Sequence, residues 1–209
     1  MQLDIPSPPS LPAPPTLVHY TLENPWPVAA LLVLVAAIVF SIYHQRGQPR
    51  KALGWALSAA ALAGGLVVLG RFIVTPREAI ADATRSLVSG VAQADTAALD
   101  SALGDPCTLY YFQAPDGLDR AGILAAVSRF FEKGSAYRLS GWQIESLQTH
   151  AGGATTGQAQ VKVLARPEQW NLPHHSWWRI DFRKGNDNVW RATAIMPLAV
   201  QGVDNPSGR

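Results

Sequence analysis

Two long apolar runs near the N-terminus dominate the hydrophobic pattern of this chain. The first has eighteen residues without a charged side chain, from Trp26 to Tyr43, and the second covers residues 52–74, with Arg71 close to its end. At about 1.5 Å per helical residue, the first run spans roughly 27 Å, close to the hydrocarbon thickness of a bilayer. Aromatic rings at its two ends suit the membrane interface. The pattern predicts two transmembrane helices, over 26–43 and 52–74.

Buried core helices and a cleaved signal peptide are the alternative interpretations of these runs. Both runs lack the polar face that a helix on a protein surface carries, which favours the membrane. A signal peptide needs a basic region before its apolar stretch, whereas no Lys or Arg precedes Arg46. The second run is rich in small residues between Gly54 and Gly65. Close packing against the first helix is the preferred explanation of these residues, ahead of self-association.

Charge sets the expected orientation of these helices. The connection 44–51 carries Arg46, Arg50 and Lys51, and the N-terminal segment 1–24 carries no basic residue. Under the positive-inside rule the connection lies in the cytoplasm, so both termini face the periplasm or the cell exterior. No Asn-x-Ser/Thr acceptor site occurs without an intervening proline. This agrees with a bacterial chain and hence with a location in the inner membrane.

Proline content separates the N-terminal segment from the rest of the chain. Eight prolines fall within the first 27 residues. Proline fixes φ and lacks a backbone donor, so it excludes regular helix and sheet interior. Residues 1–24 are therefore expected to form an extended, disordered tail. The membrane part then covers 25–74, an outward-facing domain covers 75–199, and a short disordered tail covers 200–209.

The pattern after the second apolar run is that of a soluble domain, with thirteen residues of each charge sign. Thr75, Pro76 and Glu78 form a helix-start signature, and apolar residues then recur at helical spacing. Asp95 and Asp119 are expected to cap two further helices. The balanced charge leaves no basic face of the kind that binds nucleic acid.

Five later segments have the composition of β-strands. They cover 107–112, 137–149, 155–166, 176–184 and 189–197. Pro115–Gly117 is expected to be a turn, and a shift of the alternating phase near Gly141 indicates a β-bulge. Alternation places four residues of the last strand on one apolar face: Trp190, Ala192, Ala194 and Met196.

The strand over 176–184 carries adjacent tryptophans that must point to opposite faces of the sheet. Alternation turns Trp178 inward, and it turns Trp177 outward beside Arg179 and Asp181. A tryptophan exposed between charged residues is typical of an interface anchor. The outer sheet face, centred on Trp177, Arg179 and Asp181, is therefore expected to contact a protein partner or a second copy of the chain.

The order of elements is helix, helix, strand, helix and then four strands, which is an α+β arrangement. In this order and in length, residues 75–199 resemble the SnoaL-like, or nuclear transport factor 2-like, superfamily. The resemblance implies a cone-shaped domain of three helices packed on a bent, mainly antiparallel sheet, often around a pocket. We expect Tyr111, Trp142 and Trp178 to line that pocket, which would suit a small apolar ligand. The resemblance also implies frequent dimers through the outer sheet face.

The residue patterns point to no catalytic motif, metal site or cofactor. Adjacent histidines in a strand face opposite ways, so His174 and His175 make a poor metal pair, and a loop position is preferred for them. Acidic residues such as Asp105 and Asp116 stand in no arrangement that fixes a general base. His150, at the end of a strand, is expected at a solvated turn.

Two functions are compatible with these observations. The first is a membrane-anchored, non-catalytic binding or scaffold module, and membrane-anchored scaffold subunits of the superfamily are similar in plan. The alternative is a membrane-tethered isomerase, dehydratase or hydrolase that uses an acid–base residue in the cone. A deep pocket with a desolvated acid would favour an enzyme or a small-ligand carrier, and an open or filled apolar cone would favour the scaffold.

Overall fold

The computed structural model describes residues 5, 7–13, 24–111, 114–135, 137–169 and 172–202. The chain divides into two compact units. One unit covers Ala13–Thr75, and the other joins Pro76–Arg209 with Met1–Pro12 at the N-terminus. Most of the expected tails, over 1–24 and 200–209, lies outside the described residues.

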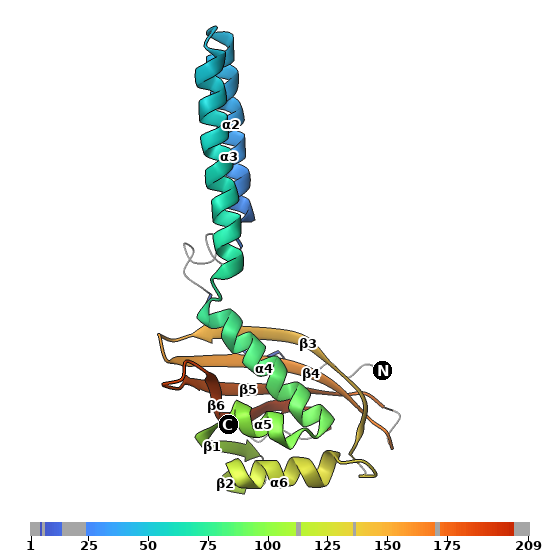
Figure 1. Ribbon diagram of the computed structural model, residues 1–209. Helices are drawn as coiled ribbons and strands as arrows, with labels where there is room; N and C mark the ends of the chain where they lie inside the picture. The colour runs from blue at the N-terminus through green and yellow to red at the C-terminus, as the bar shows by residue number, and fades with distance from the viewer. Residues whose placement is uncertain are drawn as a thin grey trace. The chain divides into compact units, whose positions relative to one another are not determined.

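The described part of the smaller unit is mainly a pair of apolar helices, α2 (Trp26–Gln45) and α3 (Pro49–Phe72), which lie side by side (Figure 1). Both helices are long and apolar enough to cross a membrane. In their most apolar stretches only 6% and 11% of the residues are buried inside the structure. Large side chains such as Leu34 and Leu57 are more than half exposed. The pair therefore lacks the burial of core helices in a soluble protein.

The connection between these helices is shorter than the sequence predicts. Residues of the expected connection 44–51 continue both helices, which leaves only Arg46–Gln48 outside them. Pro49 is the first residue of α3, where its missing N–H removes no intrahelical hydrogen bond. Gly47, at φ +71°, makes the reversal possible at a left-handed position.

The described residues of the larger unit form three helices: α4 (Pro76–Gln93), α5 (Thr96–Ala102) and α6 (Arg120–Phe131). Two of the expected N-caps are confirmed. The Asp95 carboxylate accepts a hydrogen bond from the Ala98 backbone N–H at 2.9 Å. Asp119 accepts one from the Gly122 N–H at 2.8 Å. Each side chain satisfies a donor that the first helical turn leaves unpaired.

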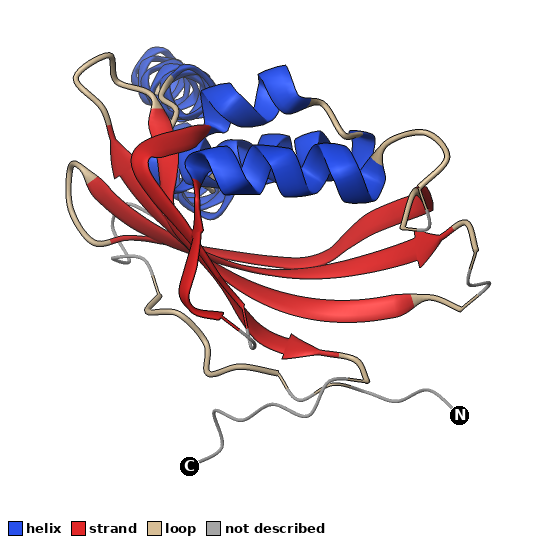
Figure 2. Cartoon of the chain, turned by 90° about the horizontal axis from the view of Figure 1, so that it is seen from below, coloured by secondary structure: helices blue, strands red, loops and turns tan. Residues whose placement is uncertain are grey.

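A six-stranded mixed sheet forms the other layer of this unit, in the order β2-β1-β6-β5-β4-β3. The strands are β1 (Leu103–Tyr111), β2 (Ala114–Asp119), β3 (Leu139–Ala151), β4 (Thr156–Pro167), β5 (His174–Lys184) and β6 (Trp190–Val200). The β1–β6 pair is parallel, and the other four neighbouring pairs are antiparallel. The sheet is bent, and the three helices lie against its concave face (Figure 2). The expected α+β cone is confirmed.

The strand β2 is absent from the sequence-based assignment, which has a turn at Pro115–Gly117. In the structure these residues form an irregularity inside the strand: Leu109 pairs with Leu118, and Tyr111 already pairs with Ala114. Gly117 has φ +69°, which explains the turn-like composition. A turn signal therefore marks a bulged edge strand here.

Register shifts decide which side chains of β3 and β6 reach the concave face. The bulge expected near Gly141 is confirmed by the shift between Leu139 and Gly141. Two shifts against β5 break the phase of β6. Ala192 pairs with Phe182 on the concave face, whereas Met196 pairs with Arg179 on the convex face. The common apolar face expected for Trp190, Ala192, Ala194 and Met196 is therefore wrong.

The hydrophobic core lies between the helices and the concave face of the sheet. Ile80 and Leu87 of α4 and Ile123 and Val127 of α6 meet side chains of the central strands there. Ile180 of β5 is 1% exposed. Burial of apolar surface contributes about 25 cal/mol per Å² and supplies most of the stabilisation of a small domain.

Candidate ligand-binding cavity

A cavity of about 420 Å³ remains inside the cone, between the helices and the concave face of the sheet. This volume falls within the roughly 300–1,000 Å³ that small-molecule sites occupy. Its wall consists mainly of aliphatic and aromatic side chains from α4, α6 and the strands. Leu87, Val127, Phe130, Val163 and Ile180 are examples. The helices and the sheet therefore do not pack the concave space completely.

The three residues expected to line a pocket, Tyr111, Trp142 and Trp178, all lie in the wall of this cavity. Tyr111 is 41% exposed, which places it where the cavity meets solvent. The Trp178 indole Nε1–H donates to the Ser176 hydroxyl oxygen at 2.8 Å, which fixes the ring on the concave face. Their contact with a ligand stays a prediction.

The chemistry of this wall is almost wholly apolar. Among the described residues that line the cavity there is no Asp, Glu, His, Lys, Arg or Cys, and Tyr111 is the one ionisable side chain. The buried Cys107 thiol lies in the nearby core but outside the wall. Burial raises the pKa of Cys107 to about 11, against a smaller lowering by the Arg120 charge. The thiol is therefore protonated at neutral pH and is a poor nucleophile.

The convex face of the sheet differs from the sequence-based expectation at its centre. Trp177 is only 4% exposed, so the expectation that it lies open on the surface of a single chain is wrong. Its indole Nε1 is buried and makes no hydrogen bond with the residues that the structure describes. Arg179 Nε lies 3.1 Å from Asp181 Oδ1, and Gln158 donates to the same oxygen at 2.8 Å. The charges of Arg179 and Asp181 thus satisfy each other along one strand.

Part of the N-terminal segment lies on this convex face. The Leu11 backbone N–H donates to the Gln148 side-chain carbonyl oxygen at 3.2 Å, and Gln148 is on β3. In Figure 2 a loop segment runs below the sheet, on the face turned away from the helices. Residues 7–13 have no regular secondary structure. Composition alone gave no sign of this contact, because proline-rich segments are usually solvated.

Glu145, His175 and Lys162 form a charged cluster on the convex face. Glu145 Oε2 lies 3.1 Å from Lys162 Nζ and 3.1 Å from His175 Nδ1. Burial raises the pKa of Glu145. The Lys162 hydrogen bond and the charges of Lys162 and His175 lower it by more, so the pKa lies below its usual range. His174 and His175 both belong to β5, so the loop position expected for these two histidines is wrong.

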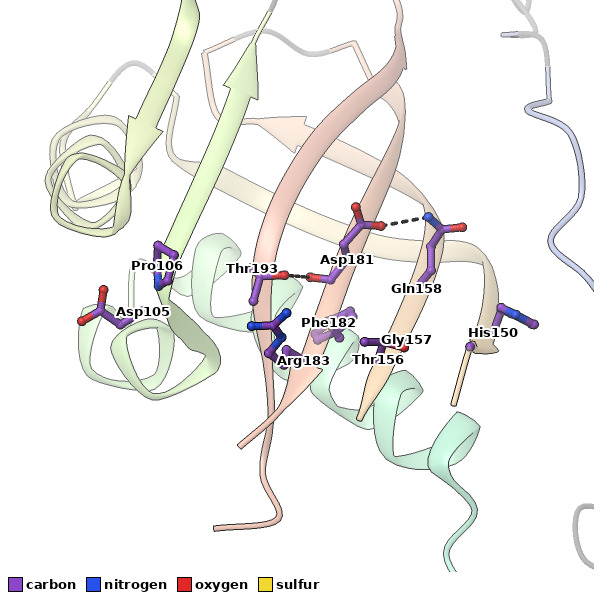
Figure 3. Close-up of a pocket in the computed structure, with 11 residues that line it drawn as sticks. Asp105, Pro106, His150, Thr156, Gly157, Gln158, Asp181, Phe182, Arg183 and Thr193 are labelled. Carbon is purple, nitrogen blue, oxygen red and sulfur yellow. Dashed lines mark hydrogen bonds between the residues drawn. The ribbon is translucent and has the colours of Figure 1, made fainter. Parts of the chain in front are cut away.

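A second hollow of about 530 Å³, lined by both polar and apolar residues, lies at the end of the sheet where the β3–β4 turn meets β5 (Figure 3). Asp105, His150, Asp181 and Arg183 are its charged or titratable residues. Figure 3 shows Asp105 and His150 at opposite ends of the hollow, so they form no acid–imidazole pair. The Asp181 carbonyl oxygen accepts from the Thr193 hydroxyl at 3.2 Å. Within the described part of the chain, no group of three or more His, Cys, Asp or Glu residues could hold a metal ion.

No protein-family model matches this chain, and no curated protein matches it. Similar solved structures include an NTF2-like protein from Cytophaga hutchinsonii, 16% identical over 60% of this chain and 99% of its own, with a TM-score of 0.47. A ketosteroid isomerase-like protein from Erwinia carotovora atroseptica is 12% identical over 61% of this chain and 99% of its own, with a TM-score of 0.47.

A third similar structure is the association domain of CaMKII from C. elegans, 12% identical over 56% of this chain and 92% of its own, with a TM-score of 0.48. At these identities and scores the matches concern the fold and carry no inference about activity. The name of the first of these structures, NTF2-like, is the abbreviated name of the superfamily that the order of elements resembles.

Proposed function

We propose that this protein is a membrane-anchored, non-catalytic binding protein whose cone takes a small apolar ligand. The observation that carries the proposal is the cavity of about 420 Å³ with its apolar wall. An apolar ligand gains roughly 25 cal/mol for each Å² of apolar surface that leaves water in such a site. The alternative, an acid–base enzyme, would need a titratable residue within hydrogen-bond reach of the substrate in the cone. The described wall offers only Tyr111.

The location of the domain is a further part of this proposal. Arg46, Arg50 and Lys51 cluster at the tight connection between α2 and α3. If both helices span a bacterial inner membrane, the positive-inside rule puts this connection in the cytoplasm and the domain in the periplasm. A reporter that is active only in the periplasm, fused after Arg209, should then be active. Activity of a cytoplasm-only reporter at the same position would overturn the orientation.

Ligand binding can be tested with N-phenyl-1-naphthylamine, a neutral apolar dye, and the full chain in lipid nanodiscs. Trp142 and Trp178 line the cavity, so energy transfer from tryptophan to a bound dye should saturate as the dye is added. Dye that only partitions into lipid should give a rise that does not saturate.

Two neighbouring residues of α6 supply a matched pair of variants. Ala126 lines the cavity, whereas Ala125 is exposed on the same helix. Ala126→Phe should fill the space and remove the saturable signal, and Ala125→Phe should retain it. A purely non-saturating signal in the unaltered chain would refute the proposal. Equal binding by the two variants would refute it as well.

A further inference from the structure

The exposure of side chains along the N-terminal segment repeats every three residues. Ile5, Pro8 and Leu11 are half-buried. The other described residues of this segment are exposed: Ser7, Pro9, Ser10, Pro12 and Ala13. Three residues per turn is the period of a polyproline II helix, which is the conformation that proline-rich sequences prefer. One side of such a helix is therefore turned toward the protein.

The convex face of the sheet contains buried residues, although the described helices α4, α5 and α6 lie against the concave face. Gln160 of β4 is 6% exposed and Trp177 of β5 is 4% exposed, although both share the convex face with Arg179, the strand partner of Gln160. Gln160 is the strand partner of Gln148, the residue whose side chain accepts the Leu11 N–H. The contact of the segment with β3 thus lies directly beside the buried Gln160.

We propose that residue 5 and residues 7–11 belong to a polyproline II strap, bound in cis across the convex face of the sheet. The strap uses the side formed by Ile5, Pro8 and Leu11 and covers the surface around Gln160. Proline-rich helices bind in this way because their conformation is largely preformed, so little entropy is lost on docking. The occupant of the convex face in a single chain is then its own N-terminal segment. A second copy or a protein partner could reach this face only after the strap leaves.

Covalent attachment to the rest of the chain keeps the strap close to its binding surface on the sheet. The hydrogen bond from the Leu11 N–H to the Gln148 side chain joins partly buried groups. Such a bond contributes little by itself. A covalently attached segment, however, acts at an effective concentration in the millimolar range. The strap is therefore expected to be closed most of the time and yet displaceable by a competitor.

A cysteine introduced at position 160 can show whether the strap covers this part of the sheet. Gln160→Cys places a thiol at the buried position, and the native Cys107 is 2% exposed, so it should not react with a charged maleimide. Labelling of the full chain in nanodiscs should be slow when the strap is closed. Leu11→Asp, which puts a charge on the docked side, should raise the labelling rate severalfold. Ser10→Asp, which puts the same charge on the exposed side, should leave the rate unchanged.

A peptide in trans makes the test independent of the point substitutions. A chain that carries Gln160→Cys and lacks residues 2–13 should label as fast as the Leu11→Asp variant. A peptide of residues 5–13 at millimolar concentration should slow this labelling again. Rapid labelling of the unaltered strap chain would overturn the proposal, and so would equal rates for Leu11→Asp and Ser10→Asp or a peptide without effect. None of these outcomes depends on a ligand in the cone.

Discussion

The concave and convex faces of the sheet are both buried at their centres, but by different means. Apolar side chains on the concave face meet three helices and enclose a cavity. The convex face has a polar and charged pattern, and yet Gln160 and Trp177 are buried there. Alternation along a strand therefore tells which side chains share a face, and it does not tell what covers that face.

Two adjacent residues of β5 show the difference at the level of single atoms. The indole N–H of Trp178, on the concave face, donates to Ser176. The indole N–H of Trp177, on the convex face, is buried without a hydrogen-bond partner among the described residues. A buried donor without a partner is destabilising by about 1–3 kcal/mol. The cover of the convex face is thus less well matched to what lies beneath it than the concave core is.

Trp177→Ala should cause the largest loss of stability among these variants. A small loss would contradict the burial of the convex face at its centre. Because the side chain is 4% exposed, its truncation should lower the free energy of unfolding by about 3–5 kcal/mol. A surface tryptophan would give a change within about 0.5 kcal/mol. The measurement is urea unfolding of the full chain in detergent micelles, followed by near-ultraviolet circular dichroism of the domain.

Phenylalanine substitutions at the same two positions separate ring burial from hydrogen bonding. Trp177→Phe removes an unpaired buried donor, and the gain from this offsets the packing lost with the smaller ring, so the free energy of unfolding should change little. Trp178→Phe removes the bond to Ser176 and should lower it by about 0.5–1.5 kcal/mol more than Trp177→Phe does. The opposite order would show that the Trp177 N–H is paired in solution.

Gly157→Ala tests the concave face where Ile80 of α4 packs against β4. A Cβ at this position would lie 2.2 Å from Ile80 Cδ1, and Ile80 is fully buried, so its side chain has little room to move. Overpacking of this kind should lower the free energy of unfolding by about 1–3 kcal/mol. Ala165→Val adds volume to the cavity wall instead and should change stability by less than about 0.5 kcal/mol. Equal losses for the two variants would mean that the cavity is closed in solution.

Much of the concave side was predictable from the sequence, because its signals are local. The caps at Asp95 and Asp119 and the inward phase of Trp178 each depend on a few neighbouring residues. Fewer features of the convex side were predictable from the sequence. The burial of Trp177 and the contact of Leu11 with Gln148 join segments that are far apart in the chain. The two register shifts of β6 come from its pairing with β5, and no periodicity in one strand can report a partner's register.

Dependence on pH should come from the convex face, and this is the smallest of the expected effects. The pKa of Glu145 lies below its ordinary value of 4.5. Burial raises this pKa, but the hydrogen bonds and charges of Lys162 and His175 together lower it by more. A carboxylate with a depressed folded-state pKa stabilises the fold at pH values above its unfolded pKa. That contribution is lost as the pH falls through the folded-state value.

The urea midpoint of the unaltered chain should therefore fall as the pH is lowered below about 4.5. The fall should be smaller in Glu145→Gln. Glu132→Gln, at an exposed position, should follow the unaltered chain. If Glu145→Gln showed the same fall, the Glu145 cluster would not control the acid response. The described wall of the cone has no group that titrates in this range, so the titrating group would then lie elsewhere on the polar surface.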